Sequence, residues 1–386
     1  MRKRIYLDYA ATTPVDPAVL VAMRPYFNRD FGNPSSLHSF GQKAKSALEG
    51  SRNVIAGLIG AKSEEIIFTS SATESNNLAL KGVAFANRDK GNHIIISAIE
   101  HDCVLNTALW LSKQGFEITQ IPVGKDGLVD PERIEKSIKK DTILVSVIWG
   151  NNEIGTLQPI VEIGRICRKK NVLFHTDAAQ TFGKIPIDVV RDNVDLLTAS
   201  SHKIYGPKGA AFLFVKRGIL LTPILHGGGQ ERNLRSSTEN IGSIVGFAIA
   251  AEIADERMNS ENKKLLMMRD KIINKILRKV PDSYLNGHPT KRISNIANLR
   301  FAFVEGESMI MELSAAGIAV STGSACSSPK LEPSHVLLAL GLRPEEIHGS
   351  VRISLGRWTT DKEIDYLIEV LPRVVEKLRK ISPFAR

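Results

Sequence analysis

Residues 172–180 read Val172-Leu173-Phe174-His175-Thr176-Asp177-Ala178-Ala179-Gln180, and residues 196–203 read Leu196-Leu197-Thr198-Ala199-Ser200-Ser201-His202-Lys203. In each stretch an apolar run gives way to polar side chains, the pattern of a buried strand that leads into a loop. The carboxyl ends of parallel strands share one edge of a sheet, where α/β proteins place their sites. These two stretches therefore predict an α/β fold with Asp177 and Lys203 at its functional edge.

The flanking sequence extends this pattern into a sheet. Short apolar runs alternate with helical patterns from about residue 60 to 215, as expected for βα crossovers. The expected strands cover residues 65–69, 93–97, 117–121, 142–149, 172–176, 196–200 and 210–215. We therefore predict a large domain with a mostly parallel, seven-stranded sheet.

Beyond Thr238 the pattern changes to one long helix over residues 240–280, which Pro281 and the turn Asn286-Gly287-His288-Pro289 end. A strand over 293–303, a helix over 307–316, a strand over 350–355 and a final helix from Asp361 follow. These elements predict a smaller α+β domain. We place the large domain at residues 16–262 and the small domain at residues 1–15 and 263–386.

The composition is that of a globular protein: 386 residues, 43% of them hydrophobic and 24% charged. No apolar run is long enough to span a bilayer, and Asp8 and Pro14 interrupt any signal-peptide core, so we expect a cytoplasmic protein without membrane contact. The three cysteines are scattered, which indicates neither a disulfide framework nor a metal site. The net charge of +10 lies largely on helix faces, and without interleaved aromatic residues it makes a nucleic-acid partner unlikely.

The polar residues after the strands suit pyridoxal phosphate (PLP). Lys203 can form a Schiff base with its aldehyde, and Asp177 can keep its pyridinium nitrogen protonated. Ser200 and His202 are placed to donate to its phosphate. Lys208, in the turn that follows, competes with Lys203 for the Schiff base.

A second phosphate-binding element is expected where Ser70-Ser71-Ala72-Thr73-Glu74 follows a strand and opens a helix. The N–H groups of the helix start at Ala72 and Thr73, with the Thr73 hydroxyl, would bind a phosphate. A plain capping box, with Ser71 as the cap and Glu74 three residues on, is the alternative.

Three more side chains follow strands. His101 could stack on the pyridine ring and move protons, and Asn152 and Gln180 could reach its phenolic oxygen. A surface histidine and a turn asparagine are the alternatives. The glycine-rich segment 226–238 either is a flexible surface loop or contacts a phosphate through Thr238.

Taken together, these motifs resemble the NifS/IscS cysteine desulfurases, which belong to the class V aminotransferase-like PLP enzymes. The resemblance covers nearly the whole chain and includes residues 6–14, 31–38, 151–155, 201–209 and 227–238. It implies the fold-type I PLP architecture and a homodimer, in which Thr238 contacts the phosphate of the neighbouring subunit. It also implies cofactor roles for Ala72, Thr73, His101, Asn152, Asp177, Gln180, Ser200, His202 and Lys203.

Cys326 stands in Ser321-Thr322-Gly323-Ser324-Ala325-Cys326-Ser327-Ser328, a polar setting that suits a nucleophile which carries a product away. A buried apolar thiol is the alternative. The resemblance makes Cys326 the persulfide carrier and a transient iron–sulfur ligand, with no resident metal. It assigns the substrate carboxylate to Arg352, with help from Asn33. Arg357 is the weaker candidate for that role.

We therefore predict a cysteine desulfurase that converts L-cysteine to L-alanine and supplies sulfur for iron–sulfur cluster assembly or tRNA thiolation. The predicted catalytic residues are Cys326, Lys203 and His101, and the expected partner is an iron–sulfur scaffold protein or another sulfur acceptor. A transaminase or a selenocysteine lyase on the same fold is one rival reading. A non-catalytic regulatory protein and an RNA-binding protein are the others.

Overall fold

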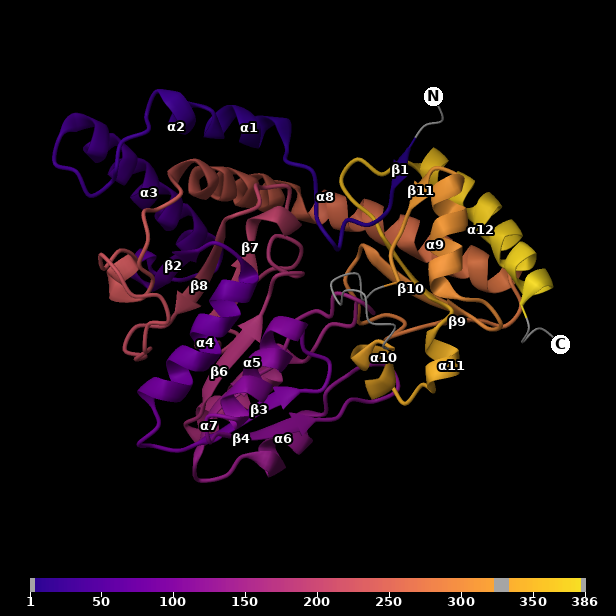
Figure 1. The fold of residues 1–386 in the computed structure, drawn as a ribbon, viewed down its shortest axis with the longest axis horizontal. Coiled ribbons are helices and arrows are strands. Elements are labelled where there is room, and N and C mark those ends of the chain that lie inside the picture. The colour runs from indigo at the N-terminus through magenta and orange to yellow at the C-terminus, as the bar shows by residue number, and fades with distance from the viewer. Residues whose placement is uncertain (1–3, 323–332, 383–386) are drawn as a thin grey trace.

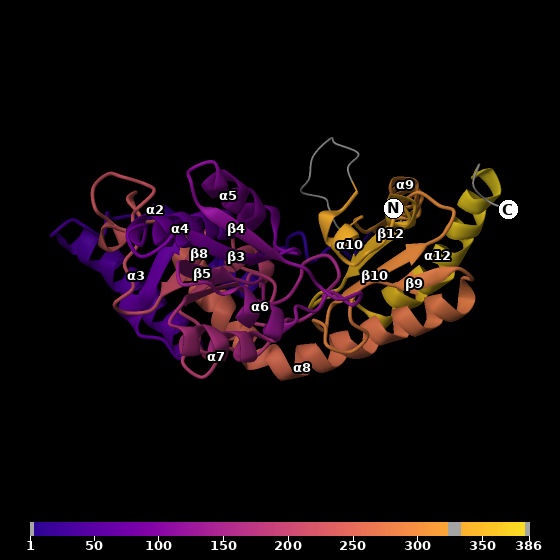
Figure 2. The ribbon, with the colours of Figure 1, turned by 90° about the horizontal axis from the view of Figure 1, so that it is seen from below.

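The computed structural model describes residues 4–322 and 333–382, which form a larger and a smaller lobe joined by one long helix (Figure 1). Cys326 lies outside the described residues. Figure 2 shows this helix, α8 (Ile241–Lys279), running beneath both lobes. Among the described residues, no helix is both long and apolar enough to cross a membrane.

The described part of the larger lobe contains a seven-stranded sheet in the order β2-β8-β7-β6-β5-β3-β4. Its strands are β2 (Ile66–Thr69), β3 (His93–Ser97), β4 (Glu117–Ile121), β5 (Thr142–Ser146), β6 (Leu173–Asp177), β7 (Leu196–Ser200) and β8 (Ala211–Val215). From β7 to β4 all neighbours pair in parallel, whereas β8 is antiparallel to β2 and to β7. The predicted mostly parallel sheet is confirmed, and the strand expected over 142–149 ends earlier, at Ser146.

Helices cover both faces of this sheet, because its strands are apolar on both sides. In β3, Ile94 and Ile96 pack on one face and Ile95 on the other, as the pleat of a strand requires. One face is covered by α4 (Ala72–Ala86) and α5 (Asp102–Ser112). The opposite face packs against α3 (Ser39–Leu58), α7 (Ile160–Lys170) and the first half of α8. The outer helices are α1 (Pro17–Met23), α2 (Pro25–Asn28) and α6 (Pro131–Ser137).

Helix α8 matches the predicted long helix, and its two halves serve different cores. Asn240 caps its start by accepting the N–H of Ser243 at 3.3 Å, and Val280 ends it. Its buried residues up to Ala254 belong to the core of the larger lobe, whereas those from Leu265 onward belong to the smaller one. The predicted domain boundary at residue 262 falls within this interval and stays a prediction.

The smaller lobe is built on an antiparallel sheet in the order β12-β10-β9. Its strands are β9 (Ser283–Leu285), β10 (Ile296–Phe301) and β12 (Ser350–Ser354), with a parallel pair of β1 (Ile5–Tyr6) and β11 (Ile318–Ala319) beside them. Its helices are α9 (Gly306–Ala315), α10 (His335–Ala339), α11 (Pro344–Ile347) and α12 (Asp361–Ile381). Ile5 and Leu7 lie in its core, so the start of the chain packs with its end.

Arg357 joins the lobes at the point where the chain leaves β12. Its guanidinium binds Asp16 through Nη1 and Glu261 through Nε, both at 2.6 Å, and lies 4.2 Å from the ring centroid of Tyr205. Its backbone N–H donates to the Tyr205 hydroxyl at 2.6 Å. These contacts engage Arg357 in the lobe junction, and its weaker candidacy for the substrate carboxylate stays a prediction.

Candidate active site

The predicted polar side chains follow parallel strands at their carboxyl ends. Strand β6 ends at Asp177, and β7 runs into a 3₁₀ turn that contains His202 and Lys203. His101 begins α5 after β3, and Asn152 lies in the turn after β5. Because all four strands point the same way, these residues are directed to one edge of the sheet.

Asp177 is buried, with 3% of its surface exposed, and two donors hold its carboxylate. Oδ2 accepts a hydrogen bond from Asn76 Nδ2 at 2.7 Å, and Oδ1 accepts the N–H of Ala179 at 2.9 Å. Asn76 belongs to α4 and is fully buried. It ties the start of α4, where Ala72 and Thr73 lie, to the end of β6. This role of Asn76 has no signature in the sequence.

The N-terminal segment brings Lys203 and Gln180 together. Lys203 Nζ donates to the carbonyl oxygens of Ala10 at 2.7 Å and Ala11 at 2.8 Å. Gln180 Nε2 donates to the same Ala10 oxygen at 2.8 Å. A backbone carbonyl carries no side-chain signature, so the sequence pattern could not reveal this meeting point.

His202 is held by Thr12, whose Oγ1 lies 3.1 Å from Nδ1. Burial, together with the positive charges of Lys203, Lys208 and Lys184, lowers the pKa of His202 to about 3. The imidazole is therefore neutral near pH 7, so it can offer a phosphate a hydrogen bond but not a positive charge.

Lys184 is a half-buried lysine beside Gln180 that was not among the predicted site residues. Its Nζ donates to Gln180 Oε1 at 3.3 Å, which directs the Gln180 amide nitrogen toward Ala10. Burial, followed by the charge of Lys203, lowers the pKa of Lys184 to about 7. A Lys-Ile-Pro sequence after a strand carries no signal that could have revealed this burial.

His101 caps α5 with its ring. Nδ1 accepts the backbone N–H of Cys103 at 3.1 Å and lies 3.1 Å from the Cys103 sulfur. The sulfur in turn accepts from Asn76 Nδ2 at 3.0 Å. His101 is therefore linked through Cys103 and Asn76 to Asp177, although these residues come from three separate segments.

Arg352 reaches the same region from β12 of the smaller lobe. Its Nη1 donates to the Asn152 carbonyl oxygen at 2.9 Å, and its Nη2 lies 2.8 Å from Asp8 Oδ1. Only 3% of its side chain is exposed. The guanidinium thus connects the start of the chain, the turn after β5 and the smaller lobe. Its contact with Asn152 is to the main-chain carbonyl and not to the side chain.

The start of α4 contains a cap but not the reciprocal capping box. Ser71 Oγ accepts the N–H of Glu74 at 3.1 Å, as expected of an N-cap. The Glu74 carboxylate instead accepts the N–H of Ser70 at 2.9 Å and binds Arg235 Nε at 2.7 Å. Arg235 belongs to the glycine-rich segment, which is therefore tied to the first turn of α4.

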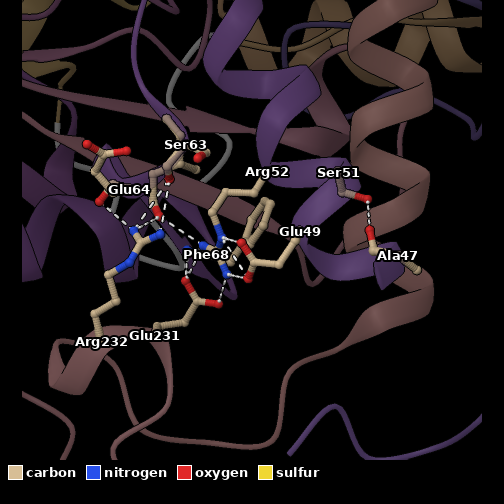
Figure 3. Close-up of polar contacts among 10 residues, drawn as sticks. Ala47, Glu49, Ser51, Arg52, Ser63, Glu64, Phe68, Glu231 and Arg232 are labelled. Carbon is tan, nitrogen blue, oxygen red and sulfur yellow. Dashed lines mark hydrogen bonds and ion pairs between the residues drawn. The ribbon is translucent and has the colours of Figure 1, made fainter. Parts of the chain in front are cut away.

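A buried ion pair anchors the rest of this segment (Figure 3). Glu231 binds Arg52 of α3 through both oxygens, at 2.7 and 2.8 Å, and accepts the N–H of Phe68 at 2.8 Å. Glu231, Arg232 and Asn233 have φ values of 43°, 57° and 63°, a left-handed conformation that is costly for residues with side chains. The surrounding contacts therefore hold this part of the loop in one conformation, which differs from a flexible surface loop.

Two predicted residues stand apart from this arrangement. Asn33 and Thr238 both lie on exposed segments. Among the described residues, no hydrogen bond joins either of them to Lys203 or Asp177. Their predicted roles, like that of Cys326, stay predictions.

The fold is that of an α/β enzyme of the fold-type I PLP architecture, and the candidate site lies between the larger sheet and the smaller lobe. The model of the family Aminotransferase class-V matches residues 5–367. The chain is 51% identical to the cysteine desulfurase IscS of Methanosarcina thermophila, over 99% of this chain and 94% of that protein. It is 53% identical to cysteine desulfurase IscS 1 of Archaeoglobus fulgidus, over 99% of both chains.

Solved structures agree with these relatives. A NifS-like protein superposes with a TM-score of 0.91 at 37% identity, covering 97% of this chain and all of the other. SspA in complex with cysteine superposes with a TM-score of 0.83 at 38% identity, covering 92% of this chain and all of the other. The chain therefore belongs to the class-V aminotransferase family and, within it, to the cysteine desulfurases.

Proposed function

We propose that this enzyme uses pyridoxal phosphate to remove the sulfur of L-cysteine, leaving L-alanine, and that Cys326 receives the sulfur as a persulfide. The observation that carries the proposal is the placement of Lys203 and the buried Asp177 carboxylate at the ends of adjacent parallel strands. An amine for the aldehyde and an acid for the ring nitrogen are the two groups this cofactor requires.

The other residues at this edge fit the same cofactor. The first turn of α4 presents backbone N–H groups that have no partner within the helix, which suits a phosphate. When bound, the cofactor supplies an electron-accepting ring that stabilises negative charge on the substrate carbon. The residues that would hold it are Ala72, Thr73, Ser200 and His202 at the phosphate, Asn152 and Gln180 at the phenolic oxygen, and His101 on the ring.

The chain's own residues would carry out the remaining steps. Arg352 would exchange Asp8 for the substrate carboxylate, with help from Asn33, because a guanidinium binds a carboxylate bidentately. Lys203 then takes the α proton. The Cys326 thiolate attacks the substrate sulfur, so that an S–S bond forms as the C–S bond breaks. The electron pair of the broken bond stays on the β carbon, which takes up a proton. Lys203 returns a proton to the α carbon, and the product is alanine.

We also propose a homodimer. Large apolar side chains are exposed around the first helices: Phe27 is 66% exposed, Phe31 64%, Leu37 90% and Phe40 52%. Such a patch is typical of an interaction surface, and a second copy of this chain would cover it. The dimer would place Thr238 at the neighbouring subunit's phosphate. Light scattering at micromolar concentration tests this, and a monomer would contradict it.

The proposed setting is the cytoplasm, where thiols stay reduced. Cys103 and Cys167 are both buried and free, in keeping with a reducing compartment. A persulfide on Cys326 would be handed to a protein that accepts sulfur, such as an iron–sulfur scaffold or a tRNA-thiolation protein.

The test is to incubate the purified enzyme with L-cysteine and a thiol reductant, and to measure alanine and sulfide together. We expect equal amounts of both, and no persulfide in Cys326→Ala. Pyruvate and ammonia in place of alanine would contradict the proposal, as would substantial sulfur transfer by Cys326→Ala.

A matched pair of lysine variants tests the Schiff base. Lys203→Ala should reduce turnover by roughly 10²–10⁴-fold, because the cofactor anchor and the proton carrier are lost together. Lys208→Ala is the control, since this residue is exposed, and it should keep near-normal turnover. The opposite result would move the assignment to Lys208.

A further inference from the structure

Cys103 is a cysteine at the candidate site that the proposed reaction does not use. Its thiol lies between two residues that the site needs: 3.1 Å from His101 Nδ1 and 3.0 Å from Asn76 Nδ2. Only 9% of Cys103 is exposed, so its sulfur is largely enclosed by these neighbours. The position therefore suits a structural link better than a reactive thiol.

The hydrogen-bond directions in this link can be worked out from Asp177. A carboxylate only accepts, so Asn76 must turn its Nδ2 toward Asp177 Oδ2, 2.7 Å away. The other hydrogen of Nδ2 then points at the sulfur of Cys103. Because the sulfur accepts on that side, its own hydrogen is available for His101 Nδ1.

The contacts of Nδ1 indicate which tautomer His101 adopts. Nδ1 also accepts the backbone N–H of Cys103 at 3.1 Å, so its single lone pair is shared between that N–H and the thiol. A neutral imidazole that accepts at Nδ1 carries its proton at Nε2. His101 then offers the site a hydrogen-bond donor rather than a base.

We propose that the Cys103 thiol is a positioning residue that, with Asn76, holds the His101 ring in its Nε2–H form and couples it to Asp177. This rests on the proposed function, in which His101 faces the ring of the cofactor. In this arrangement Lys203 removes the α proton, and His101 donates a hydrogen bond through its Nε2–H.

Nitrogen NMR of the full-length protein labelled with ¹⁵N-histidine tests the proposal. In the wild type, His101 Nδ1 should give the signal of a nitrogen that accepts hydrogen bonds, and Nε2 that of a protonated one. Cys103→Ala should move the Nδ1 signal toward that of a less hydrogen-bonded nitrogen. Cys103→Ser keeps a hydrogen-bond donor and should restore the wild-type Nδ1 signal. Cys167→Ala is the matched control. Cys167 is a buried cysteine of α7, and its replacement should leave the His101 signals unchanged.

Kinetics provide the second readout. Cys103→Ala should lower kcat by about three- to tenfold with KM unchanged, a fraction of what a whole acid–base group contributes, and Cys103→Ser should recover it. A Cys103→Ala variant that matches Cys167→Ala in both readouts would overturn the proposal, as would an Nδ1–H signal in the wild type. The NMR result does not depend on substrate, so failure of the desulfurase assay alone would count against the proposed function and not against the Cys103 link.

Discussion

Two buried glutamates in this protein occupy similar positions but face opposite electrostatic surroundings. Glu231 anchors the glycine-rich loop, and Glu100 lies beside the site, just before His101. Each accepts a backbone N–H at 2.8 Å, from Phe68 and Ile148 respectively. Glu231 is 5% exposed and Glu100 1%, so neither gains much from water.

The side-chain partner of each glutamate differs. Glu231 faces Arg52. Burial acts to lower the pKa of Arg52, but the hydrogen bonds and charge of Glu231, followed by those of Glu49, outweigh it and raise that pKa. Glu100 faces the Ser97 hydroxyl instead. Burial raises the pKa of Glu100 to about 8 despite the hydrogen bonds from Ser97 and Ile148, and the charge of Asp177 adds to the rise.

Two carboxyls that are equally buried therefore meet different partners: Glu231 contacts a guanidinium, whereas Glu100 contacts a hydroxyl. Beside the glycine-rich loop, an ion pair holds a left-handed backbone in place. Beside the site, burial raises the pKa of Glu100 to about 8, so this carboxyl is mostly protonated near pH 7.

The largest expected loss of stability follows from removing the charge of Arg52. Arg52→Met leaves Glu231 buried without a cation, which should cost about 3–5 kcal/mol in the free energy of unfolding. Urea denaturation measures this. The control is the double variant Arg52→Met/Glu231→Leu, which removes both charges and should recover much of the loss. A loss below about 1 kcal/mol for the single variant would contradict the anchoring role.

A pH titration of stability is the next largest test. The pKa of Glu100 rises from 4.5 in the unfolded chain to about 8 in the fold, so the folded state holds the extra proton between these values. Its stabilising contribution is therefore complete below pH 4.5 and is lost as pH rises toward 8. The wild type should lose up to about 1.4 kcal/mol per pH unit relative to Glu100→Gln.

Glu100→Gln is a suitable reference, because a glutamine oxygen can still accept from Ser97 and Ile148 without ionising. Thermal and urea unfolding between pH 6 and 8 give the difference. Parallel stability curves for the two proteins would show that Glu100 stays ionised in the fold and would remove the contrast with Glu231.

Arg52→Lys keeps the positive charge at this position but removes the planar guanidinium. A lysine cannot bind both Glu231 oxygens and the Ile66 carbonyl as the guanidinium does, nor stack equally well on the Phe68 ring, 4.9 Å away. We expect a loss of about 1–2 kcal/mol, between the wild type and Arg52→Met. A lysine variant as unstable as Arg52→Met would mean that geometry, not charge, holds the loop.

The smallest effect belongs to Glu49, which also contacts Arg52, at 3.2 Å, but from the surface. Its side chain is 46% exposed, so water screens the pair. Glu49→Gln should change stability by less than about 0.5 kcal/mol in the same urea assay. A loss as large as that for Arg52→Met would show that the outer carboxylate, not Glu231, is the main partner.

Much of the fold could be predicted, because its signals are local. Apolar runs marked each strand of the large sheet to within a few residues, and Asn240 and Pro281 marked the ends of α8. The antiparallel direction of β8 was not predicted, since a strand's own residues do not specify its direction when both faces are buried.

The candidate site was predicted through its side chains but not through its connections. Asp177, Lys203 and His101 follow strands and were visible as polar endings. The Ala10 carbonyl that receives Lys203, and the Asn76 amide that holds Asp177, could not be recognised, because their partners lie 193 and 101 residues away. The glycine-rich segment 226–238 was open to two readings, and its left-handed turn at Glu231 appears only in the folded chain.

The sequence by itself determined the order of strands and helices and the residue types at the strand ends, because backbone periodicity and chain polarity are properties of neighbouring residues. Only the tertiary structure decided which partner each buried carboxyl meets. Glu231 and Arg52 are 179 residues apart and meet in the fold, whereas Glu100 is buried beside a hydroxyl. Desolvation and the nearest countercharge set ionisation, and both exist only once distant segments have packed together.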